Sequence, residues 1–379
     1  MHKLLIILIL LILFVSCGQG QQSTSQNALL TPIPVPSKKT KKLSDFVSRI
    51  EYLKLPEDAK VARVDKAQEY NSLYFFGDFE LEKGISLIDS DMKLVANINK
   101  WGEGPGEYLS IVDFTINKDQ KTVDVLSNHK LIRYDFQGNF LNEVKLPFFF
   151  YKIQHIQGND YLAYIPKVSH ADLQGPDSIS ILWVWDIGTN QTARVASPLE
   201  TIKIPFFTER NNLNLQNGKL LFSTNFMDTI YTYDKDGELL EKRFFNSDRP
   251  YLPLDIIESS ANLTLEQSEK YYYHQANLLE DEQFFVTRLI ENGYFTNLIF
   301  SKKRNTSVIF SQVENDVDFG FDWIMPVLLT DGILMSISES SFLVSHLEKG
   351  GIPKESLFNK FAKDLTDNSP MVLTKYYLK

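Results

Sequence analysis

Apolar and polar residues alternate in short runs along most of this chain, as they do in β-strands that bury one face. The first such run spans residues 46–55, and shorter runs follow at 62–64, 73–76 and 85–88. Turn-forming residues separate the runs at intervals of about 8–12 residues, which is typical of a β-sandwich, a barrel or a propeller. No amphipathic helix of ordinary length interrupts the first 250 residues. The pattern therefore predicts an all-β fold.

A recurring turn selects among these all-β folds. Runs of β pattern end at four aspartates that are separated by 46, 51 and 48 residues, namely Asp89, Asp135, Asp186 and Asp234. The carboxylate of such a residue accepts hydrogen bonds from backbone N–H groups two residues further on, and a glycine at positive φ closes the hairpin. A degenerate fifth copy ends at Ser301, which leaves room for an insertion between residues 246 and 270. A period of about 45–50 residues built from short strands indicates a β-propeller with four strands in each blade.

Three strands are predicted between residues 271 and 300. Residues 284–290 and 294–300 flank the pair Asn292-Gly293, a strong signal for a two-residue hairpin. The aromatic run 271–279 precedes them and fits either a helix or a strand. We interpret it as a strand because it completes the same sheet.

The C-terminal segment is predicted to contain one short helical insertion and the strand that closes the ring. Residues 354–365 place their apolar side chains on one helical face. A last β run, 371–378, follows Pro370. Because propellers commonly close by pairing strands from the two ends of the chain, we expect this run to share a blade with residues 46–55.

The N-terminus carries an apolar run, residues 4–15, after a short polar start. Twelve residues are too few to cross a hydrocarbon core of about 30 Å, so the run fits the apolar part of a signal peptide. Ser16-Cys17-Gly18 follows at once and resembles the processing site of a bacterial lipoprotein. The resemblance implies that residues 1–16 are a signal peptide and that Cys17 is lipidated and begins the mature protein. A plain secretory signal is the alternative.

Residues 17–44 are rich in Gln, Ser, Thr, Pro and Lys and poor in core-forming residues. They are predicted to form a flexible tether from Cys17, and residues 45–379 are predicted to form the propeller. The tether has no acidic cluster after Cys17, whereas surface-displayed lipoproteins of the Bacteroidetes type often carry one. We therefore expect a lipid-anchored protein of the bacterial cell envelope, in the outer membrane and facing the periplasm.

The composition excludes several classes of protein. The chain has 379 residues and a net charge of −9, with 39 Lys and Arg against 48 Asp and Glu. Such an acidic balance argues against nucleic acid as a partner, because phosphate backbones bind clustered basic residues. Cys17 is the only cysteine, so no intramolecular disulfide or thiolate metal cluster can form. The six histidines are scattered and match no zinc motif.

Two motifs carry a family resemblance. Residues 102–108, GEGPGEY, resemble the GxGPGEY corner of the six-bladed β-propeller lipoproteins of Bacteroidetes, which are relatives of NHL-repeat propellers. Residues 228–231, DTIY, match a second motif of that family. The resemblance covers about residues 46–379 and implies six blades of four antiparallel strands, where chain length alone would also allow seven. It implies a fold and a location, but little chemistry.

The glycine-rich loop does not have the features of a phosphate site. No Lys-Ser/Thr pair follows it, Pro105 lacks the N–H that a phosphate cradle needs, and Glu103 and Glu107 repel anions. The structural interpretation is a tight corner whose Tyr108 packs inward. The alternative is a loop on one face of the propeller that contacts a sugar or a peptide.

The candidate ligand-binding residues come from the two motifs and the residue before the first. They are Trp101, Glu103, Glu107, Tyr108, Asp228 and Tyr231. For the last two, the competing interpretation is an ordinary turn into a strand.

Five aspartates are candidates for an axial Ca²⁺ site, because Ca²⁺ takes oxygen ligands. They are Asp113, Asp124, Asp316, Asp318 and Asp322, and they lack the spacing of an EF-hand. Aromatic clusters are predicted to pack mainly between blades, with a platform for a glycan as the alternative. The clusters are 148–151, Trp183 with Trp185, 206–207 and 319–323.

We expect a binding or scaffolding module for a protein or glycan partner, because the chain carries no GxSxG motif, no nucleophilic cysteine and no metal–histidine set. A propeller hydrolase or lyase with an axial divalent metal is the alternative. It requires carboxylates or amides from several blades to converge on the axis, which sequence cannot show. A purely structural protein of the envelope is a third reading.

Overall fold

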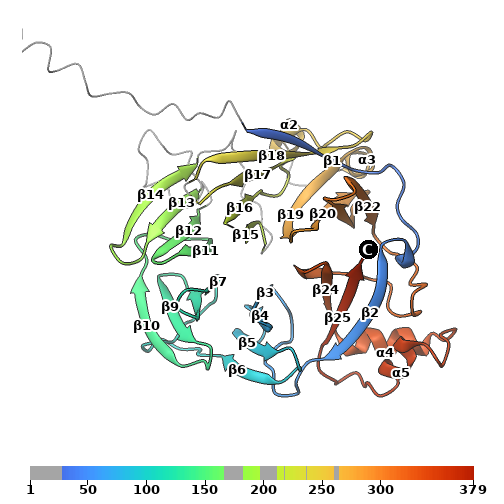
Figure 1. Ribbon diagram of the computed structural model, residues 1–379, viewed down its shortest axis with the longest axis horizontal. Helices are drawn as coiled ribbons and strands as arrows, with labels where there is room; N and C mark the ends of the chain where they lie inside the picture. Colours follow the sequence, from blue (N-terminus) through green and yellow to red (C-terminus); the bar gives the residue numbers. More distant parts are fainter. Residues whose placement is uncertain (1–27, 166–181, 197–210, 217, 236, 260–263) are drawn as a thin grey trace, which may run out of the picture.

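Six antiparallel sheets surround a central axis in the computed structural model (Figure 1). The structure describes residues 28–379 apart from the segments 166–181, 197–210, 217, 236 and 260–263. Each sheet forms one blade of four strands, and one sheet has a fifth strand in addition. The predicted six-bladed β-propeller is therefore confirmed.

The first three blades follow the chain in order. Blade 1 consists of β3 (Lys66–Tyr70), β4 (Leu73–Asp78), β5 (Gly84–Asp89) and β6 (Leu94–Ile98). Blade 2 consists of β7 (Asp113–Asn117), β8 (Thr122–Leu126), β9 (Lys130–Asp135) and β10 (Phe140–Lys145). Blade 3 consists of β11 (Lys152–Gln157), β12 (Asp160–Tyr164), β13 (Leu182–Asp186) and β14 (Gln191–Ala196). In every blade the first strand lies at the axis and the fourth on the outer side, where one blade carries an added strand beyond it (Figure 1).

The other three blades contain both ends of the described chain. Blade 4 consists of β15 (Leu213–Gln216), β16 (Lys219–Phe222), β17 (Thr229–Tyr233), β18 (Leu239–Asn246) and the added strand β1 (Leu29–Pro34). Blade 5 consists of β19 (Tyr272–Glu280), β20 (Phe284–Glu291), β21 (Tyr294–Ser301) and β22 (Thr306–Phe310). Blade 6 consists of β23 (Pro326–Thr330), β24 (Ile333–Ser338), β25 (Val372–Leu378) and the N-terminal strand β2 (Val47–Lys54).

Strand β2 closes the ring as expected. It pairs antiparallel with β25, from Val47 opposite Leu378 to Lys54 opposite Val372. The ring therefore depends on hydrogen bonds between the two ends of the chain. The hairpin around Asn292-Gly293 and the strand interpretation of residues 271–279 are confirmed as well.

The recurring aspartates end or follow the third strand of their blades and shape the turn to the fourth strand. Asp135 Oδ1 accepts hydrogen bonds from the backbone N–H groups of Gln137 and Asn139, at 2.9 and 2.8 Å. In blade 1, Asp89 Oδ1 accepts the same two hydrogen bonds, from the backbone N–H groups of Asp91 and Lys93. Gly138 adopts φ +79°, a conformation that glycine reaches without steric cost. The predicted chemistry of this turn is confirmed.

Hydrophobic clusters fill the space between neighbouring blades. Between blades 2 and 3, for example, Phe150 packs edge-on against Trp185, and both side chains are fully buried. Such aromatic pairs add about 0.5–1.5 kcal/mol beyond the area they bury. The prediction of inter-blade aromatic packing is confirmed there, whereas residues 206–207 lie outside the described part. It is wrong for Phe319 and Trp323, whose side chains are 49% and 50% exposed.

The structure has more helices than the sequence pattern predicts. They are α2 (Leu254–Ser259), α3 (Leu265–Lys270), α4 (Ser340–Glu348), α5 (Leu357–Ala362) and the 3₁₀ turn η2 (Leu43–Asp45). The predicted helix 354–365 corresponds to the shorter α5, and the expected insertion between residues 246 and 270 contains α2 and α3. No helix among the described residues has the length and apolar character needed to span a membrane.

The prediction of a flexible tether over residues 17–44 is wrong for its second half. Residues 29–34 form β1, which lies parallel to β18, and Leu43 in η2 is fully buried. Local sequence gives little sign of this strand, because two of its six residues are prolines. The structure accommodates them because β1 is the edge strand of its sheet. The signal peptide and Cys17 lie outside the described residues.

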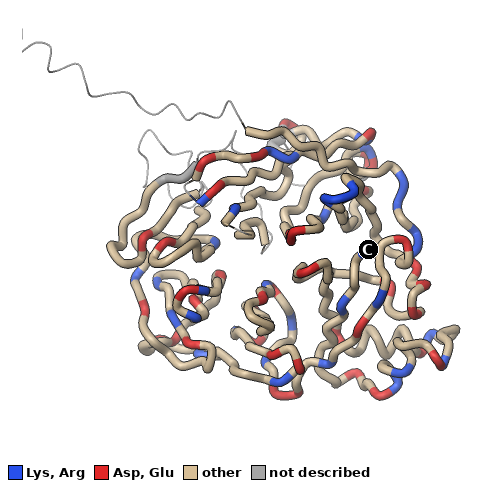
Figure 2. Tube along the Cα trace, in the orientation of Figure 1, with Lys and Arg blue, Asp and Glu red and all other residues tan. Residues whose placement is uncertain are grey.

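The two ends of the propeller differ in their connections. At one end, tight turns join the first strand to the second in each blade and the third to the fourth in blades 1–5, in the described chain. At the other end, the second strand connects to the third and each blade connects to the next, and these connections include the four α-helices of the described residues. We call these the hairpin end and the pocket end. Figure 2 shows acidic and basic residues interspersed around the ring, so the net charge is distributed.

A buried histidine predicts how stability depends on pH. His274 is fully buried beside the hydroxyl groups of Ser223 and Thr287. Burial lowers the pKa of His274 to about 3, so the folded protein keeps this ring neutral when the unfolded chain, near pKa 6.5, takes up a proton. We expect the free energy of unfolding to fall as the pH drops below about 6.5, by about 2 kcal/mol at pH 5 from this group. Urea unfolding at pH 7 and pH 5 measures this change.

The variant His274→Gln is the control. Burial also lowers the pKa of His155, so the wild-type protein has a second contribution of the same sign. The difference between wild type and variant isolates His274. An equal loss of stability in both proteins would show that His274 is not the group responsible.

Candidate functional site

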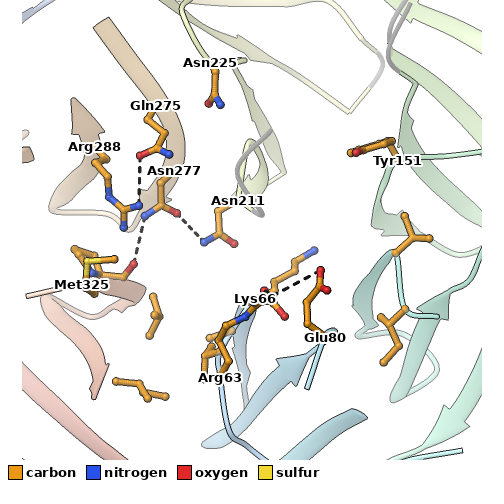
Figure 3. Close-up of a pocket in the computed structure, with 18 of the residues that line it drawn as sticks. Arg63, Lys66, Glu80, Tyr151, Asn211, Asn225, Gln275, Asn277, Arg288 and Met325 are labelled. Carbon is orange, nitrogen blue, oxygen red and sulfur yellow. Dashed lines mark hydrogen bonds and ion pairs between the residues drawn. The ribbon is translucent and has the colours of Figure 1, made fainter. Parts of the chain in front are cut away.

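A cavity of about 950 Å³ opens at the pocket end of the axis. It lies where the first strands of the blades begin, so residues just before or within those strands line it. Figure 3 shows side chains from several blades converging on this space. The propeller thus brings together residues that are far apart in the chain.

One wall of the cavity consists of amide groups. Asn211 Nδ2 donates to Asn277 Oδ1 at 2.8 Å, and Asn277 Nδ2 donates to the carbonyl oxygen of Pro326 at 3.3 Å. Arg288 Nη1 donates to Gln275 Oε1 at 3.4 Å on the same side of the cavity (Figure 3). These bonds hold the amides in fixed orientations across blades 4, 5 and 6.

The wall from blade 1 is charged, and its charged groups are paired with one another or with Asp113 of blade 2. Arg63 lies 2.6 Å from Asp65 and 3.7 Å from Glu80. Lys66 Nζ donates to Asp113 Oδ1 at 2.9 Å, and both side chains are almost completely buried. Positive and negative groups alternate on this wall, which gives it polarity without an excess of either sign.

Apolar side chains complete the cavity. They come from blade 6 and its flanking segments, Met325, Pro326, Val327, Ile337 and Met371. Phe149 and Tyr151 line the cavity from the connection that enters blade 3, and Tyr151 lies across from the amide wall in Figure 3. A ligand here meets oriented amides on one side, the balanced charges of blade 1 on another, and apolar or aromatic surface on the rest. This combination suits a neutral polar ligand such as a sugar ring or a peptide segment.

Exposed aromatic and aliphatic side chains surround the cavity at some distance. Half of the large exposed hydrophobic residues of the described chain lie in the connections of the pocket end or directly beside them: Leu81, Trp101, Leu109, Tyr294, Phe319, Trp323, Phe342 and Leu357, which are 48–71% exposed. The other large exposed hydrophobic side chains of the described chain lie on strands, and none is in a tight turn of the hairpin end. The pocket end is therefore the more hydrophobic end of the propeller surface.

The motif GEGPGEY forms the connection from β6 to β7, at the pocket end. Tyr108 is buried, and its hydroxyl group lies 2.9 and 3.0 Å from the carbonyl oxygens of Lys83 and Ile98. Glu107 Oε2 accepts a hydrogen bond from the backbone of Gly104. The inward packing of Tyr108 is confirmed, and this corner is held by its own side chains.

The predicted ligand residues do not line the cavity. Trp101 and Glu103 are exposed on the same end, and Lys83 Nζ lies 5.3 Å from the centre of the Trp101 ring. Asp228 is exposed just before β17, whereas Tyr231 is buried within that strand. The structure brings Glu103, Glu107 and Trp101 into one loop and places Asp228 in another blade.

The five candidate aspartates do not converge. Asp113 pairs with Lys66, Asp316 accepts from the backbone and hydroxyl of Ser44, and Asp318 lies near Tyr52. Asp124 is buried among Thr122, Tyr161 and Arg133 between blades 2 and 3, and burial raises its pKa. Within the described residues, no three His, Cys, Asp or Glu side chains are grouped as metal ligands. The convergent carboxylates that an axial-metal hydrolase or lyase requires are therefore not formed by these residues.

Sequence reasoning missed the residues of the amide wall. Asn211 lies beside Asn212 just before a short strand and matches no motif, and only the alternation of Gln275 and Asn277 on β19 places two amides on one face. The sequence indicates these cavity residues only after the strands have been assigned to blades. Polar residues near the start of a blade's first strand can then be expected to face the axis.

Comparisons with known proteins agree with this architecture. A solved Bacteroides fragilis protein that is described as exported matches with a TM-score of 0.72 at 15% identity, over 93% of this chain and 99% of that chain. A solved member of the DUF4221 family from Bacteroides vulgatus matches with a TM-score of 0.52 at 11% identity, over 88% and 97% of the two chains. At these identities, both show the fold alone.

The comparison with curated proteins gives no match. A family model does match, the domain of unknown function DUF4934, over residues 30–374. That range begins within β1 and ends within β25, so it includes the added strand as well as all six blades. The chain therefore belongs to the DUF4934 family of six-bladed β-propellers.

Proposed function

We propose that this chain is a lipid-anchored module of the bacterial cell envelope that binds a protein or glycan partner at the pocket end. One observation carries the proposal: the cavity, the long connections and most of the exposed aromatic side chains of the described chain occur at the same end. Rigid scaffolds commonly carry their binding residues on loops of one end. The described connections of the hairpin end are tight turns, whereas those of the pocket end include the longer segments and the α-helices of the described chain.

The chemistry of the cavity supports the role of a ligand pocket. Its volume of about 950 Å³ is within the usual range for ligand pockets. The oriented amides both donate and accept hydrogen bonds, as hydroxyl groups of a sugar and peptide groups do. In the proposal, a polar segment of the partner enters the cavity, and the exposed aromatic side chains cover the surface around it.

The candidate residues of the GEGPGEY loop take different parts in the proposal. Trp101 and Glu103 contact the partner, because their side chains are exposed. Glu107 and Tyr108 position them, because their oxygens are engaged within the loop or with neighbouring backbone. Asp228 is a second contact at the pocket end, in blade 4, with Tyr231 packed beneath it in the same blade.

The location is proposed from the N-terminal pattern. The apolar run followed by Ser16-Cys17-Gly18 supports lipidation of Cys17, and the missing acidic cluster supports an outer-membrane protein that faces the periplasm. A structural neighbour described as exported supports export alone, and the lipid anchor and the outer membrane rest on the N-terminal pattern. The GEGPGEY and DTIY motifs support kinship with NHL-like propeller lipoproteins of Bacteroidetes.

Hydroxyl-radical footprinting tests the proposal with reporters that the chain already contains. Methionine and tryptophan oxidise readily, and Met325 and Met371 line the cavity while Trp101 and Trp323 are exposed around it. We expect a soluble extract of the cell envelope to reduce oxidation at these residues in the purified protein. Oxidation at Met92, in a turn of the hairpin end, should stay the same.

Enzymatic digestion of the extract before footprinting identifies the class of partner. Protection that survives protease digestion but not glycosidase digestion identifies a glycan, and the reverse pattern identifies a protein. Equal protection at Met92 and Met325, or protection at Met92 alone, would contradict a binding site at the pocket end.

A further inference from the structure

The N-terminal segment wraps around the outside of the propeller. We call residues 29–45 the belt. It begins as β1, whose residues pair with β18 from Leu29 opposite Glu241 to Pro34 opposite Asn246. Thr31 Oγ1 donates to the carboxylate of Glu241 at 2.6 Å. The belt thus starts as an outer strand of blade 4 (Figure 1).

The belt continues past blade 5 to blade 6. The backbone N–H of Thr40 donates to Ile309 of β22 at 2.8 Å, and Lys39 Nζ donates to Ser311 Oγ at 2.6 Å. The backbone N–H of Leu43 then donates to Glu314 at 2.9 Å. Three blades therefore hold the belt.

Buried side chains fix the belt in place. Ile33 is fully buried in the cluster between blades 4 and 5, and Val35 packs in the same cluster. Leu43 is fully buried between blades 5 and 6. These contacts make the belt part of the folded propeller, so the predicted tether can extend only as far as the residue before Leu29.

The direction of β1 determines where the chain leaves the propeller. Strand β18 starts after a tight turn of the hairpin end and runs toward the pocket end. Because β1 is parallel to β18, Leu29 lies at the hairpin end and Pro34 at the pocket end. The residues before Leu29 therefore emerge at the hairpin end of blade 4.

The remaining tether is short. Residues 18–28 are the only ones between Cys17 and β1, eleven in place of the predicted 28. A flexible chain of that length has a root-mean-square span of about 18 Å, against about 29 Å for 28 residues. The propeller is about 25 Å from end to end at the eight-residue strand β21. The short tether therefore favours orientations in which the hairpin end, where the chain leaves the propeller, lies closer to Cys17 than the pocket end does.

We propose that the belt orients the propeller on a phospholipid bilayer: acyl groups at Cys17 hold the hairpin end of blade 4 toward the lipid and leave the pocket end facing away. This inference rests on the lipid anchor of the proposed function. It gives the belt a role beyond stability, because the parallel register of β1 sets which end is presented to a partner.

Energy transfer between the protein and the bilayer tests the orientation. Cys17 is the only cysteine, so the chain from Cys17 onward can be coupled at that thiol to a maleimide phospholipid in phosphatidylcholine–phosphatidylglycerol vesicles. A donor dye is attached through an unnatural amino acid at Tyr294 or at Lys303, exposed residues at the pocket and hairpin ends of β21. The acceptor is a lipid dye in the vesicle.

We expect a higher transfer efficiency from the donor at Lys303 than from the donor at Tyr294. Insertion of about 20 flexible residues after residue 27 should remove the difference, because the longer tether lets either end approach the bilayer. Equal efficiencies in the chain without the insertion, or a higher efficiency at Tyr294, would overturn the inference.

The test separates this inference from the proposed function. Chemical coupling supplies the lipid, so the result concerns the belt whether or not cells acylate Cys17. Labelling of cells with a palmitate analogue tests acylation by itself, with Cys17→Ala as the control. Footprinting at the pocket end tests binding without any membrane.

Discussion

Replacement of Lys66 by methionine is expected to lower the free energy of unfolding by about 3–5 kcal/mol, because it leaves a buried carboxylate without its cation. Asp113 joins three blades: it accepts from Lys66 Nζ of blade 1 at 2.9 Å and from the backbone N–H of Ile153 of blade 3 at 3.0 Å. Asp113 is fully buried and Lys66 is 4% exposed. Urea unfolding of wild type and Lys66→Met measures the loss.

Two control variants separate burial from charge. Adding Asp113→Asn to Lys66→Met should recover about half of the loss, because the second change removes the uncompensated charge. Lys54→Met removes the exposed pair between Lys54 and Glu57 and should cost less than about 1 kcal/mol. If Lys66→Met and Lys54→Met lose the same stability, the buried pair does not hold the blades together.

Truncation of Ile33 to alanine is expected to cost about 3 kcal/mol, because its fully buried side chain fills the space between blades 4 and 5. Leu30→Ala is the matched control in the same strand, since Leu30 is 66% exposed and should cost less than about 0.5 kcal/mol. Thermal and urea unfolding measure both. Equal effects of the two changes would show that β1 is not docked on the propeller in solution.

The repeated turns could be predicted because their chemistry is local. Asp135 bonds to backbone groups within four residues, and Gly138 supplies the φ that the hairpin needs, so both features are written in adjacent positions. The pairing of residues 371–378 with 46–55 followed from the requirement that a ring close. The local chemistry of the turns and the closure of the ring were sufficient to predict the propeller fold.

The belt and α4 could not be predicted in the same way. The segment of β1 contains two prolines and forms a strand because β18 offers an unpaired edge and the inter-blade cluster receives Ile33. Helix α4 contains three serines and a valine, which are weak helix formers, and it packs on the hydrophobic cluster through Leu343. Tertiary contacts decide the structure of both segments.

The cavity required the structure for a related reason. Asn211 and Asn277 are separated by 66 residues, yet their side chains are hydrogen-bonded across blades 4 and 5. The motifs in the sequence pointed instead to the GEGPGEY loop, whose tyrosine and glutamate are largely engaged in holding the corner. A motif that is distinctive in sequence can serve the fold, while the binding surface is assembled from isolated residues.

Photo-crosslinking in intact cells tests the central claim most directly, because it asks which end of the propeller meets a partner. A benzophenone amino acid is placed at Trp101 or Trp323 at the pocket end, and at Asp91 or Lys303 at the hairpin end, all of them exposed. We predict discrete protein or glycan adducts from the two pocket-end positions and none from the hairpin-end positions. Discrete adducts from Asp91 or Lys303, with none from Trp101 or Trp323, would contradict the account.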